Sequence, residues 1–301
     1  MPYFRLLGAQ LAIGAAAIFA RFALDGAGPF AVSALRLGIA TLAILALGAC
    51  LGRLPWRREL AFALAGLALA IHFATWITSL EYTSVAISTL LVTTTPIWTE
   101  AYDALRQRRL PGRTYVVALV CALAGVAAIA FARGSRPAPI AGHELFGDGL
   151  ALCGSFAIGA YLLVVRDAGK TGAVRLPTRA IVLRTYGWAT FALALGAAVT
   201  HQSPPPLTDA RSWGGILAMA LVSQLLGHTA LNAALRDFRP SVVALSTLAE
   251  PVVAALLAAL VFREFLGTAT LAGGVLVLAA IGIALATTRA ASETLSPELS
   301  A

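Results

Sequence analysis

The sequence is poor in charged residues. Only 12% of its 301 residues are Asp, Glu, Lys or Arg, whereas 59% are hydrophobic. A typical soluble domain has roughly 25% charged residues. Apolar runs recur along the chain, and about 20 such residues cross a ~30 Å bilayer core as a helix. Because alternating strand patterns are absent, we expect an all-α integral membrane protein.

Cysteines and catalytic motifs are also scarce. The three cysteines (Cys50, Cys121 and Cys153) lie inside apolar runs, and their odd number argues against a disulfide framework. His143 and Glu144 have no second histidine four residues on, and no glycine-rich phosphate loop is present. We therefore expect no enzyme, no metal site and no cofactor.

The apolar runs predict ten transmembrane helices. Their ranges are 4–20, 30–51, 59–80, 85–105, 114–132, 148–165, 180–200, 213–235, 241–262 and 268–287. No cleavable leader is evident before the first run, which is counted as a span.

The basic residues between the spans orient the chain. The formal charge of +8 does not indicate nucleic-acid binding, because these residues lie in short connections. If the N-terminus is cytoplasmic, 15 lie inside: Arg5, Arg53, Arg57, Arg58, Arg106, Arg108, Arg109, Arg113, Arg166, Lys170, Arg175, Arg179, Arg236, Arg239 and Arg289. Five lie outside: Arg21, Arg133, Arg136, Arg211 and Arg263. This bias predicts that both termini are cytoplasmic.

The chain repeats itself. A shift of 155 residues matches Leu80 with Leu235, Pro96 with Pro251 and Gly112 with Gly267, and a shift of 148 matches Pro29 with Pro177 and Arg36 with Arg184. Five spans per repeat mean that the second repeat enters from the opposite side, an arrangement typical of transporters with a site near the midplane. We expect repeats at 1–132 and 148–288, a periplasmic connection at 133–147 and a cytoplasmic tail at 289–301.

Two elements resemble the drug/metabolite transporter superfamily. They are the second span of each repeat, with a proline followed by an arginine (Pro29 and Arg36; Pro177 and Arg184), and the Ala249-Glu250-Pro251 turn followed by Glu264. Within it, the chain is most similar to EamA-type ten-span transporters, particularly the bacterial YddG branch. This resemblance implies a multi-pass protein of a bacterial-type inner membrane that exports amino acids.

One departure from that pattern is in the first span. Many relatives carry a tryptophan-glycine pair there and a lysine at its end. Here Gly14 follows Ile13, and Arg21 stands near the lysine position. A role given to that pair in relatives is therefore not carried over.

Polar residues on two spans are the main candidates for a substrate path. His72, Thr75, Trp76 and Ser79 share one face of span three. Polar groups inside a bilayer face a cavity or the bundle interior, so this face either lines a cavity or seals a helix interface by hydrogen bonds. Because an interface rarely needs both His and Trp, the cavity is preferred.

Span eight carries a matching stripe of Gln224, His228 and Asn232. His228 lies one residue from the position that matches His72 at the 155 shift. Two such histidines suit a central binding or proton site, and each is equally compatible with a structural hydrogen bond. Trp98 and Tyr161 sit deep enough to be walls of the same path, or to pack against lipid or other helices.

Span four and its repeat each contain a proline. Thr93 and Pro96 share a face with Glu100, and Pro251 matches Pro96. Each proline removes a helical hydrogen bond, and neighbouring hydroxyls can bond the freed carbonyls. We expect hinges at these prolines, with a static bend as the alternative.

Four buried charges remain. Arg36 and Arg184 lie about 10 Å inside opposite surfaces. We expect both to be structural, with Glu100 paired to Arg184. Glu250 lies mid-span without an arginine at matching depth, so it suits proton coupling, attraction of a substrate ammonium group, or a bond to Ser246 or Thr247.

These features predict an exporter of amino acids, including aromatic or apolar ones, or of similar small metabolites, working by alternating access. Its partners would be a small-molecule substrate and the bilayer, and the sequence is compatible with a monomer. A passive channel, or a carrier of drugs, sugars or nucleotide-sugars, would share the fold. Nucleotide-sugars fit less well, because Lys170 is the only lysine and the two arginines are expected away from the midplane.

Overall fold

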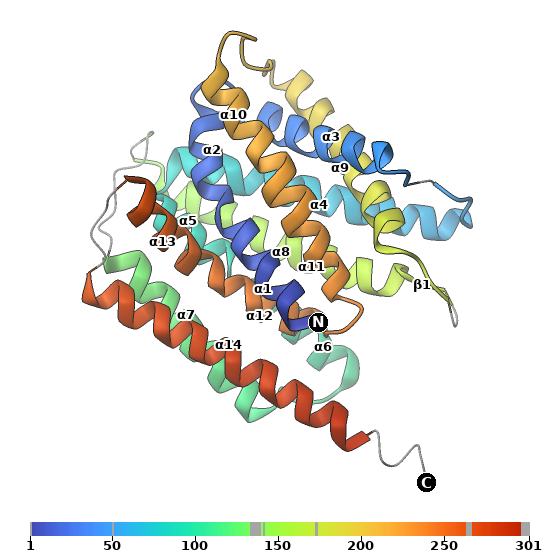
Figure 1. Cartoon of the computed structure of the whole chain (residues 1–301), viewed down its shortest axis with the longest axis vertical. Helices are drawn as coiled ribbons and strands as arrows, with labels where there is room; N and C mark the ends of the chain where they lie inside the picture. The colour runs from blue at the N-terminus through green and yellow to red at the C-terminus, as the bar shows by residue number, and fades with distance from the viewer. Residues whose placement is uncertain are drawn as a thin grey trace.

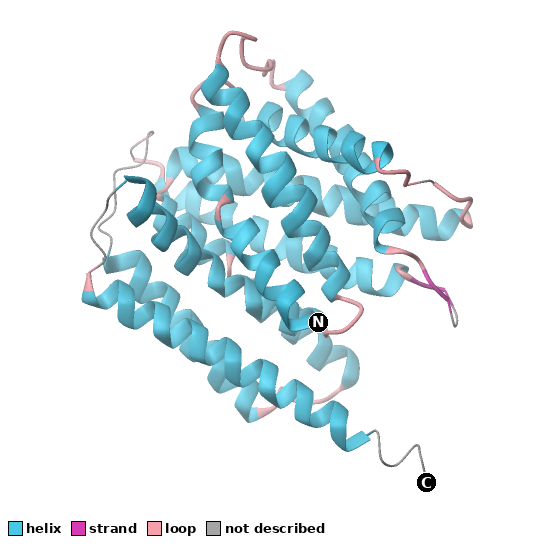
Figure 2. Cartoon of the chain, in the orientation of Figure 1, coloured by secondary structure: helices cyan, strands magenta, loops and turns pink. Residues whose placement is uncertain are grey.

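The structure, a computed structural model, describes residues 2–49, 51–132, 140, 142–171, 174–262 and 267–295. In this part of the chain the regular structure is helical apart from two short strands, β1 (Lys170–Thr171) and β2 (Val174–Arg175) (Figure 2). The helices of the first half are α1 (Pro2–Gly14), α2 (Ala16–Leu24), α3 (Pro29–Ala46), α4 (Trp56–Tyr82), α5 (Val85–Val92), α6 (Thr95–Gln107) and α7 (Arg113–Ala132). Those of the second half are α8 (Glu144–Ala168), α9 (Thr178–Val199), α10 (Ala210–Ala218), η1 (Met219–His228), α11 (Thr229–Ala234), α12 (Pro240–Ser246), η2 (Thr247–Ala249), α13 (Glu250–Phe262) and α14 (Thr268–Leu295).

Nine helices of the described chain, counting continuous runs of elements, are long and apolar enough to cross a membrane. The all-helical membrane fold is thus confirmed. The predicted fourth span differs, because it divides into α5 and α6, of 8 and 13 residues, and neither piece alone is long enough to cross.

The division between α5 and α6 has a local cause. Pro96 lacks the N–H that would bond the carbonyl of Val92. The Thr95 hydroxyl donates to that carbonyl instead, at 3.0 Å. In the second half, the 3-10 turn η2 separates α12 from α13 just before Pro251. Both matched prolines therefore follow a break in their span.

Two pairs of equivalent helices pack side by side and antiparallel, α3 with α9 and α7 with α14 (Figure 1). In the pair α3 and α9, the Phe30 ring at the start of α3 lies against Gly196 near the end of α9. In the pair α7 and α14, a Cβ added at Gly125 would lie 2.6 Å from the Gly273 carbonyl oxygen. The opposite direction of the matched helices in these two pairs agrees with an inverted repeat.

The innermost and outermost spans differ in burial. The most apolar window of the span Pro240–Leu257 is 72% buried, whereas those of α7 and α14 are 33% buried. The pair α7 and α14 therefore lies at the edge of the bundle, and the broken span that contains η2 lies at its centre (Figure 1).

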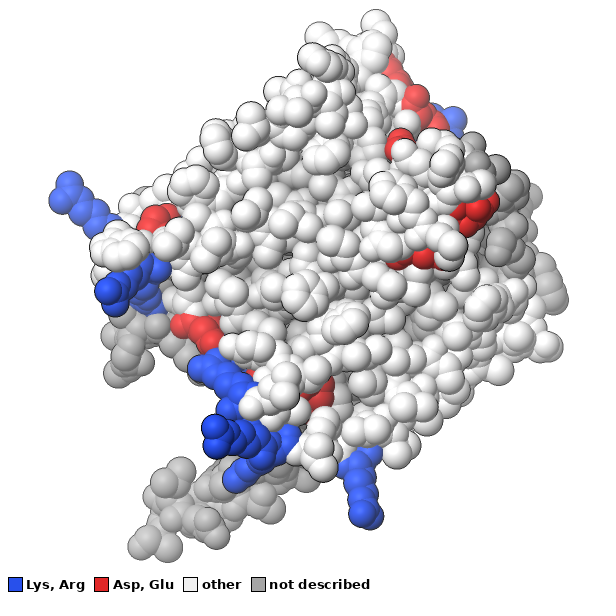
Figure 3. Space-filling model, turned by 180° about the vertical axis from the view of Figure 1, so that it is seen from behind, with Lys and Arg blue, Asp and Glu red and all other residues white. Residues whose placement is uncertain are grey.

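Charged side chains gather at the ends of the bundle. Figure 3 shows most of the visible Lys and Arg along one edge, beside a broad band without charge. At this arginine-rich end, the Asp103 carboxylate of α6 lies 2.9 Å from Arg166 and 3.5 Å from Arg239. Arg106 pairs with Asp167 at 2.6 Å. The positive-inside rule predicts that this end is cytoplasmic.

Two expected boundaries shift. Helix α8 begins at Glu144, four residues before the expected start of the second repeat, and α14 continues to Leu295 into the expected tail. Several predicted features lie outside the described residues: Cys50, Arg133, Arg136, Arg263, Glu264, most of the connection 133–147 and the last residues of the tail, 296–301.

Candidate functional site

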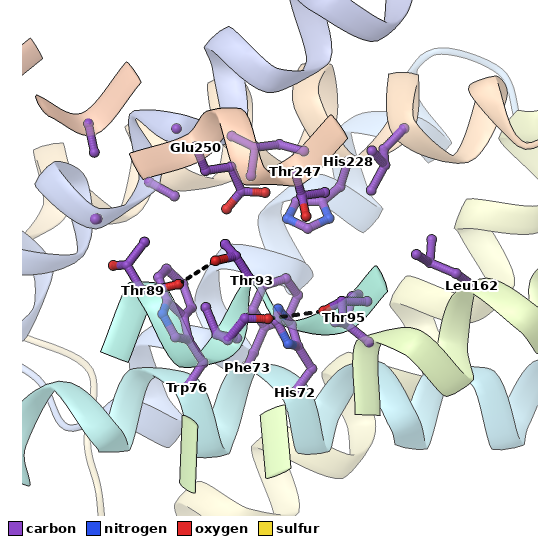
Figure 4. Close-up of a pocket in the computed structure, with 18 of the residues that line it drawn as sticks. His72, Phe73, Trp76, Thr89, Thr93, Thr95, Leu162, His228, Thr247 and Glu250 are labelled. Carbon is purple, nitrogen blue, oxygen red and sulfur yellow. Dashed lines mark hydrogen bonds between the residues drawn. The ribbon is translucent and has the colours of Figure 1, made fainter. Parts of the chain in front are cut away.

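A cavity of about 50 Å³ lies between the two halves, with room for about three water molecules. In Figure 4, His228, Thr247 and Glu250 of the second half face side chains of α4, α5 and α6 of the first half. The lining residues are Ile13, Gly14, Ala16, Ala17, Arg36, His72, Phe73, Trp76, Thr89, Val92, Thr93, Thr95, Ile158, Leu162, His228, Leu231, Thr247, Glu250 and Ala254.

Irregular helix segments position much of this lining. The threonines of the first half lie on and around the break between α5 and α6, and Thr247 lies in the 3-10 turn η2. His228 ends the π-helix η1. Wider π segments occur often at functional sites because they shift side chains out of the regular helical register. Both halves therefore present polar groups where their helices are interrupted.

Aromatic and imidazole rings form one wall. The rings of His72 and Trp76 stack, with centroids 6.2 Å apart and planes within 8°. His72 Nδ1 bonds the Gly154 carbonyl oxygen at 2.9 Å. Among the described residues, neither the Trp76 indole nitrogen nor His228 Nδ1 has a hydrogen-bond partner. The wall therefore contains two buried polar ring atoms that have no hydrogen-bond partner in the described chain.

Arg36 lines the cavity, so the expectation that it is peripheral is wrong. A depth of about 10 Å is already a third of the way across a ~30 Å core. There the Arg36 guanidinium lies 4.1 Å from the centroid of the Phe73 ring, and its Nε donates to Gln224 Oε1 at 2.9 Å. Its two terminal nitrogens have no hydrogen-bond partner within the described chain.

Glu250 begins α13 and lies in the same cavity as Arg36. An arginine therefore lines the same cavity as Glu250, which the sequence did not predict. Among the residues that the structure describes, no basic group lies within ion-pair distance of its carboxylate, and Ser246 and Thr247 instead donate to carbonyls of α12. Glu250 and Arg36 are thus an acidic and a basic side chain on one cavity without a direct contact.

Five of the ten predicted path residues line the cavity: His72, Trp76, Thr93, His228 and Glu250. The other five do not. Thr75 and Ser79 donate to carbonyls of their own helix, and Ser79 also contacts Ser88. The Trp98 indole donates to Ser155.

Tyr161 and Gln224 support the cavity from behind. The Tyr161 hydroxyl donates to Asn232, whose amide donates to the His228 carbonyl. Gln224 accepts from Arg36. Tyr161 therefore connects to the lining residue His228 through Asn232, and Gln224 contacts the lining residue Arg36 directly. Neither Tyr161 nor Gln224 belongs to the lining itself.

The predicted pair of Glu100 with Arg184 is not formed. Arg184 donates to Glu59 of α4 at 3.1 Å, to the Ala180 carbonyl and to the Gly52 carbonyl. Glu100 instead has Arg239 at 4.0 Å. Depth along a helix does not specify its neighbours, and α9 packs beside α4.

Sequence reasoning missed part of the lining. Phe73 and Thr95 are each next to a predicted residue, His72 and Pro96. Nothing in the sequence around them distinguishes them as cavity residues. Thr89 shares a helix face with Thr93, and Thr247 adjoins the Glu250 turn, so the sequence carries a signal for both as cavity-lining residues. The proline-arginine motif itself was the signal for Arg36.

Comparisons with known proteins agree with this architecture. One solved structure, titled only "Crystal structure of protein", has a TM-score of 0.76 and 18% identity over 96% of this chain and 97% of its own, which shows a shared fold. No curated protein matches the chain. Residues 1–131 and 145–286 match the EamA-like transporter family. The chain therefore belongs to the EamA-like transporter family, a family of secondary transporters.

Proposed function

We propose that this transporter exports amino acids, or similar small metabolites, across a bacterial-type inner membrane by alternating access. The observation that carries the proposal is the cavity between the halves, which bears one carboxylate, one guanidinium, two imidazoles and one indole. Opposite charges on an otherwise largely apolar wall suit a zwitterion with an apolar side chain.

Glu250 is proposed to attract the ammonium group of the substrate. It is the acidic residue of the cavity lining, and no basic side chain of the described chain neutralises it by direct contact. Trp76 and Phe73 are proposed to contact the side chain, since aromatic faces bind both apolar groups and rings. His72 and His228 complete the polar wall.

Alternating access is proposed to come from the halves 1–132 and 148–288 rocking about this cavity. Pro96 and Pro251 are the proposed hinges, because each follows a break where helical hydrogen bonds are already missing. Bending there disturbs fewer backbone bonds than bending a continuous helix.

The test is transport in proteoliposomes that contain the purified protein. Vesicles are loaded with amino acids, dipeptides, sugars or a nucleotide-sugar, with and without a pH gradient. The proposal predicts saturable amino-acid flux, stimulated by substrate on the opposite side, and slower flux for Glu250→Gln. Flux that neither saturates nor shows trans-stimulation would identify a channel, and flux of sugars or nucleotide-sugars alone would reject amino-acid export.

A further inference from the structure

We propose that Arg36 binds the carboxylate of the transported substrate, an inference that rests on the proposed amino-acid transport. The evidence is the difference between two arginines that occupy matched positions. Arg36 and Arg184 each follow a proline by seven residues in the second span of their repeat. The duplication placed the same side chain at equivalent points of α3 and α9, yet their surroundings differ.

Arg184 is satisfied by the protein. Its Nε donates to Glu59 and its terminal nitrogens donate to the Ala180 and Gly52 carbonyls. The charge is paired and each guanidinium nitrogen has an acceptor. Nothing in these contacts leaves the group open to a ligand, so a structural role accounts for it.

Arg36 is not satisfied in this way. The side chain is 0% exposed, and only Nε has an acceptor, the neutral amide oxygen of Gln224. The Phe73 ring below the guanidinium offsets part of the charge. Nη1 and Nη2 have no acceptor in the described chain. A buried guanidinium with two unpaired nitrogens and no carboxylate within ion-pair distance in the described chain is costly, so an anion that enters this cavity gains by pairing with it.

The unpartnered atoms suit a carboxylate. The two terminal nitrogens of a guanidinium form a planar fork that matches two carboxylate oxygens. Other unpartnered polar atoms lie nearby, including Gln224 Nε2 on η1 and the Trp76 indole nitrogen on α4. The acidic side chain of Glu250 lines the same cavity. A molecule with both a carboxylate and an ammonium group can therefore contact both side chains without bringing them together.

The experiment compares ligands that differ in one group. Counterflow of L-phenylalanine is competed by L-phenylalaninamide, which lacks the negative charge, and by 3-phenylpropionate, which lacks the amine. A parallel series uses L-alanine, L-alaninamide and propionate. Because the amide loses the charge-assisted hydrogen bonds to Arg36, the wild type should bind the amino acid at least ~10-fold more tightly than its amide.

Arg36→Gln and Arg36→Lys are expected to remove this preference, weakening the amino acid at least ~10-fold while changing the amide within ~2-fold. Gln224→Glu keeps the arginine but gives it a carboxylate of the protein, so it should weaken the preference too, and it serves if Arg36→Gln fails to fold. The matched control, Arg184→Lys, should keep the preference. A merely structural Arg36 would change stability without changing the ratio of the two affinities.

The carboxylate assignment is overturned if the Arg36 variants keep the preference for the amino acid over its amide, or if the wild type lacks that preference. In either case the proposed amino-acid transport still stands. If no amino acid is transported, the proposed function fails. In that case, thermal stabilisation by 3-phenylpropionate and inorganic phosphate shows whether Arg36 binds another anion, and equal stabilisation of wild type and Arg36→Gln rejects this too.

Discussion

The two deep tryptophans of the first half have different surroundings. Trp76 is buried, stacks on His72 and lines the cavity. Trp98 is 37% exposed, and its indole nitrogen donates to Ser155 of α8. From the sequence the two were equivalent candidates for a path wall. In the structure, Trp76 lies on the cavity, whereas Trp98 lies at the contact between α6 and α8.

Trp76→Ala is expected to reduce amino-acid flux at least ~10-fold, because a buried ring contributes several kcal/mol of contact and its loss enlarges the site. Trp98→Ala is expected to leave flux within ~2-fold and to lower the melting temperature instead, because it leaves Ser155 without its indole partner. Flux and melting temperature are measured on the same preparations. Equal loss of flux in both variants would contradict this assignment.

At the residue scale, the sequence pointed to cavity-lining residues where polarity was unusual for a membrane span. His72, Trp76 and His228 stood out for this reason, and all three line the cavity. It failed where the outcome depends on a neighbour that is distant in sequence. The lining role of Arg36 depends on Phe73 and on Gln224, 188 positions away, and no spacing within α3 reveals them.

At the scale of helices, close approach depends on glycine. Gly125 of α7 and Gly273 of α14 face each other, and a Cβ on either would lie 2.6 Å from the carbonyl oxygen of the other. Small residues let transmembrane helices approach closely, and packing rather than hydrophobicity then holds them together. This contact joins the two halves at the edge of the bundle.

Gly125→Ala is expected to destabilise the protein by roughly 1–3 kcal/mol, because the backbone of α14 must move away. The control is Gly282→Ala on α14, where nothing lies within 4 Å of the added Cβ. Thermal unfolding in detergent measures both. A lower melting temperature for Gly282→Ala than for Gly125→Ala would show that the crossing point does not limit stability.

Asp209 caps α10, where its carboxylate accepts from the Ser212 backbone N–H at 3.0 Å. Hydrogen bonds from the Ser212 side chain and backbone hold the pKa of the Asp209 carboxyl below its usual range. A lowered pKa stabilises the fold above the ordinary Asp value of ~3.9, and the contribution is lost as pH falls through the lowered pKa.

Wild type should therefore melt above Asp209→Asn near neutral pH, and the difference should shrink in acid as the wild-type carboxylate is protonated. Asparagine caps helices well, so the neutral cap isolates the effect of charge. Asp209→Ala, which lacks any cap, should be less stable than both at neutral pH. Melting curves of wild type and Asp209→Asn that stay parallel down to pH 3 would contradict the assignment.

At the scale of the whole molecule, the sequence predicted the order of the spans and nine of the ten membrane-length helices, because span length and hydropathy are local properties. It also predicted two inverted repeats from ungapped matches such as Pro96 with Pro251, but not which equivalent helices would pack together. The breaks of the spans were only partly predictable. Proline indicated the breaks between α5 and α6 and between α12 and α13, whereas the π-helix η1, which packs against α1 and α3, contains no proline that would indicate it.

Ion pairs join three spans at the arginine-rich end of the bundle. Asp103 of α6 is 1% exposed and lies near Arg166 of α8 and Arg239 before α12. Rocking of the halves must separate these elements if the cavity is to open at this end. These ion pairs therefore favour the state in which that end is closed.

Asp103→Asn is expected to populate the state open at this end at least ~10-fold more, since a charge-assisted bond contributes about 1.5–3 kcal/mol. The probe is Leu162→Cys, a buried cavity position, in a background without the native cysteines. A membrane-impermeant maleimide should label it faster in inside-out vesicles when Asp103→Asn is present, and no faster in right-side-out cells. The matched control is Asp167→Asn, whose carboxylate is 43% exposed and pairs at the surface, where ion pairs contribute little. Equal labelling rates in Asp103→Asn and Asp167→Asn would mean that the ion pairs of Asp103 do not hold this end closed. Faster labelling of Asp103→Asn in right-side-out cells would instead mean that the predicted orientation of the chain is reversed.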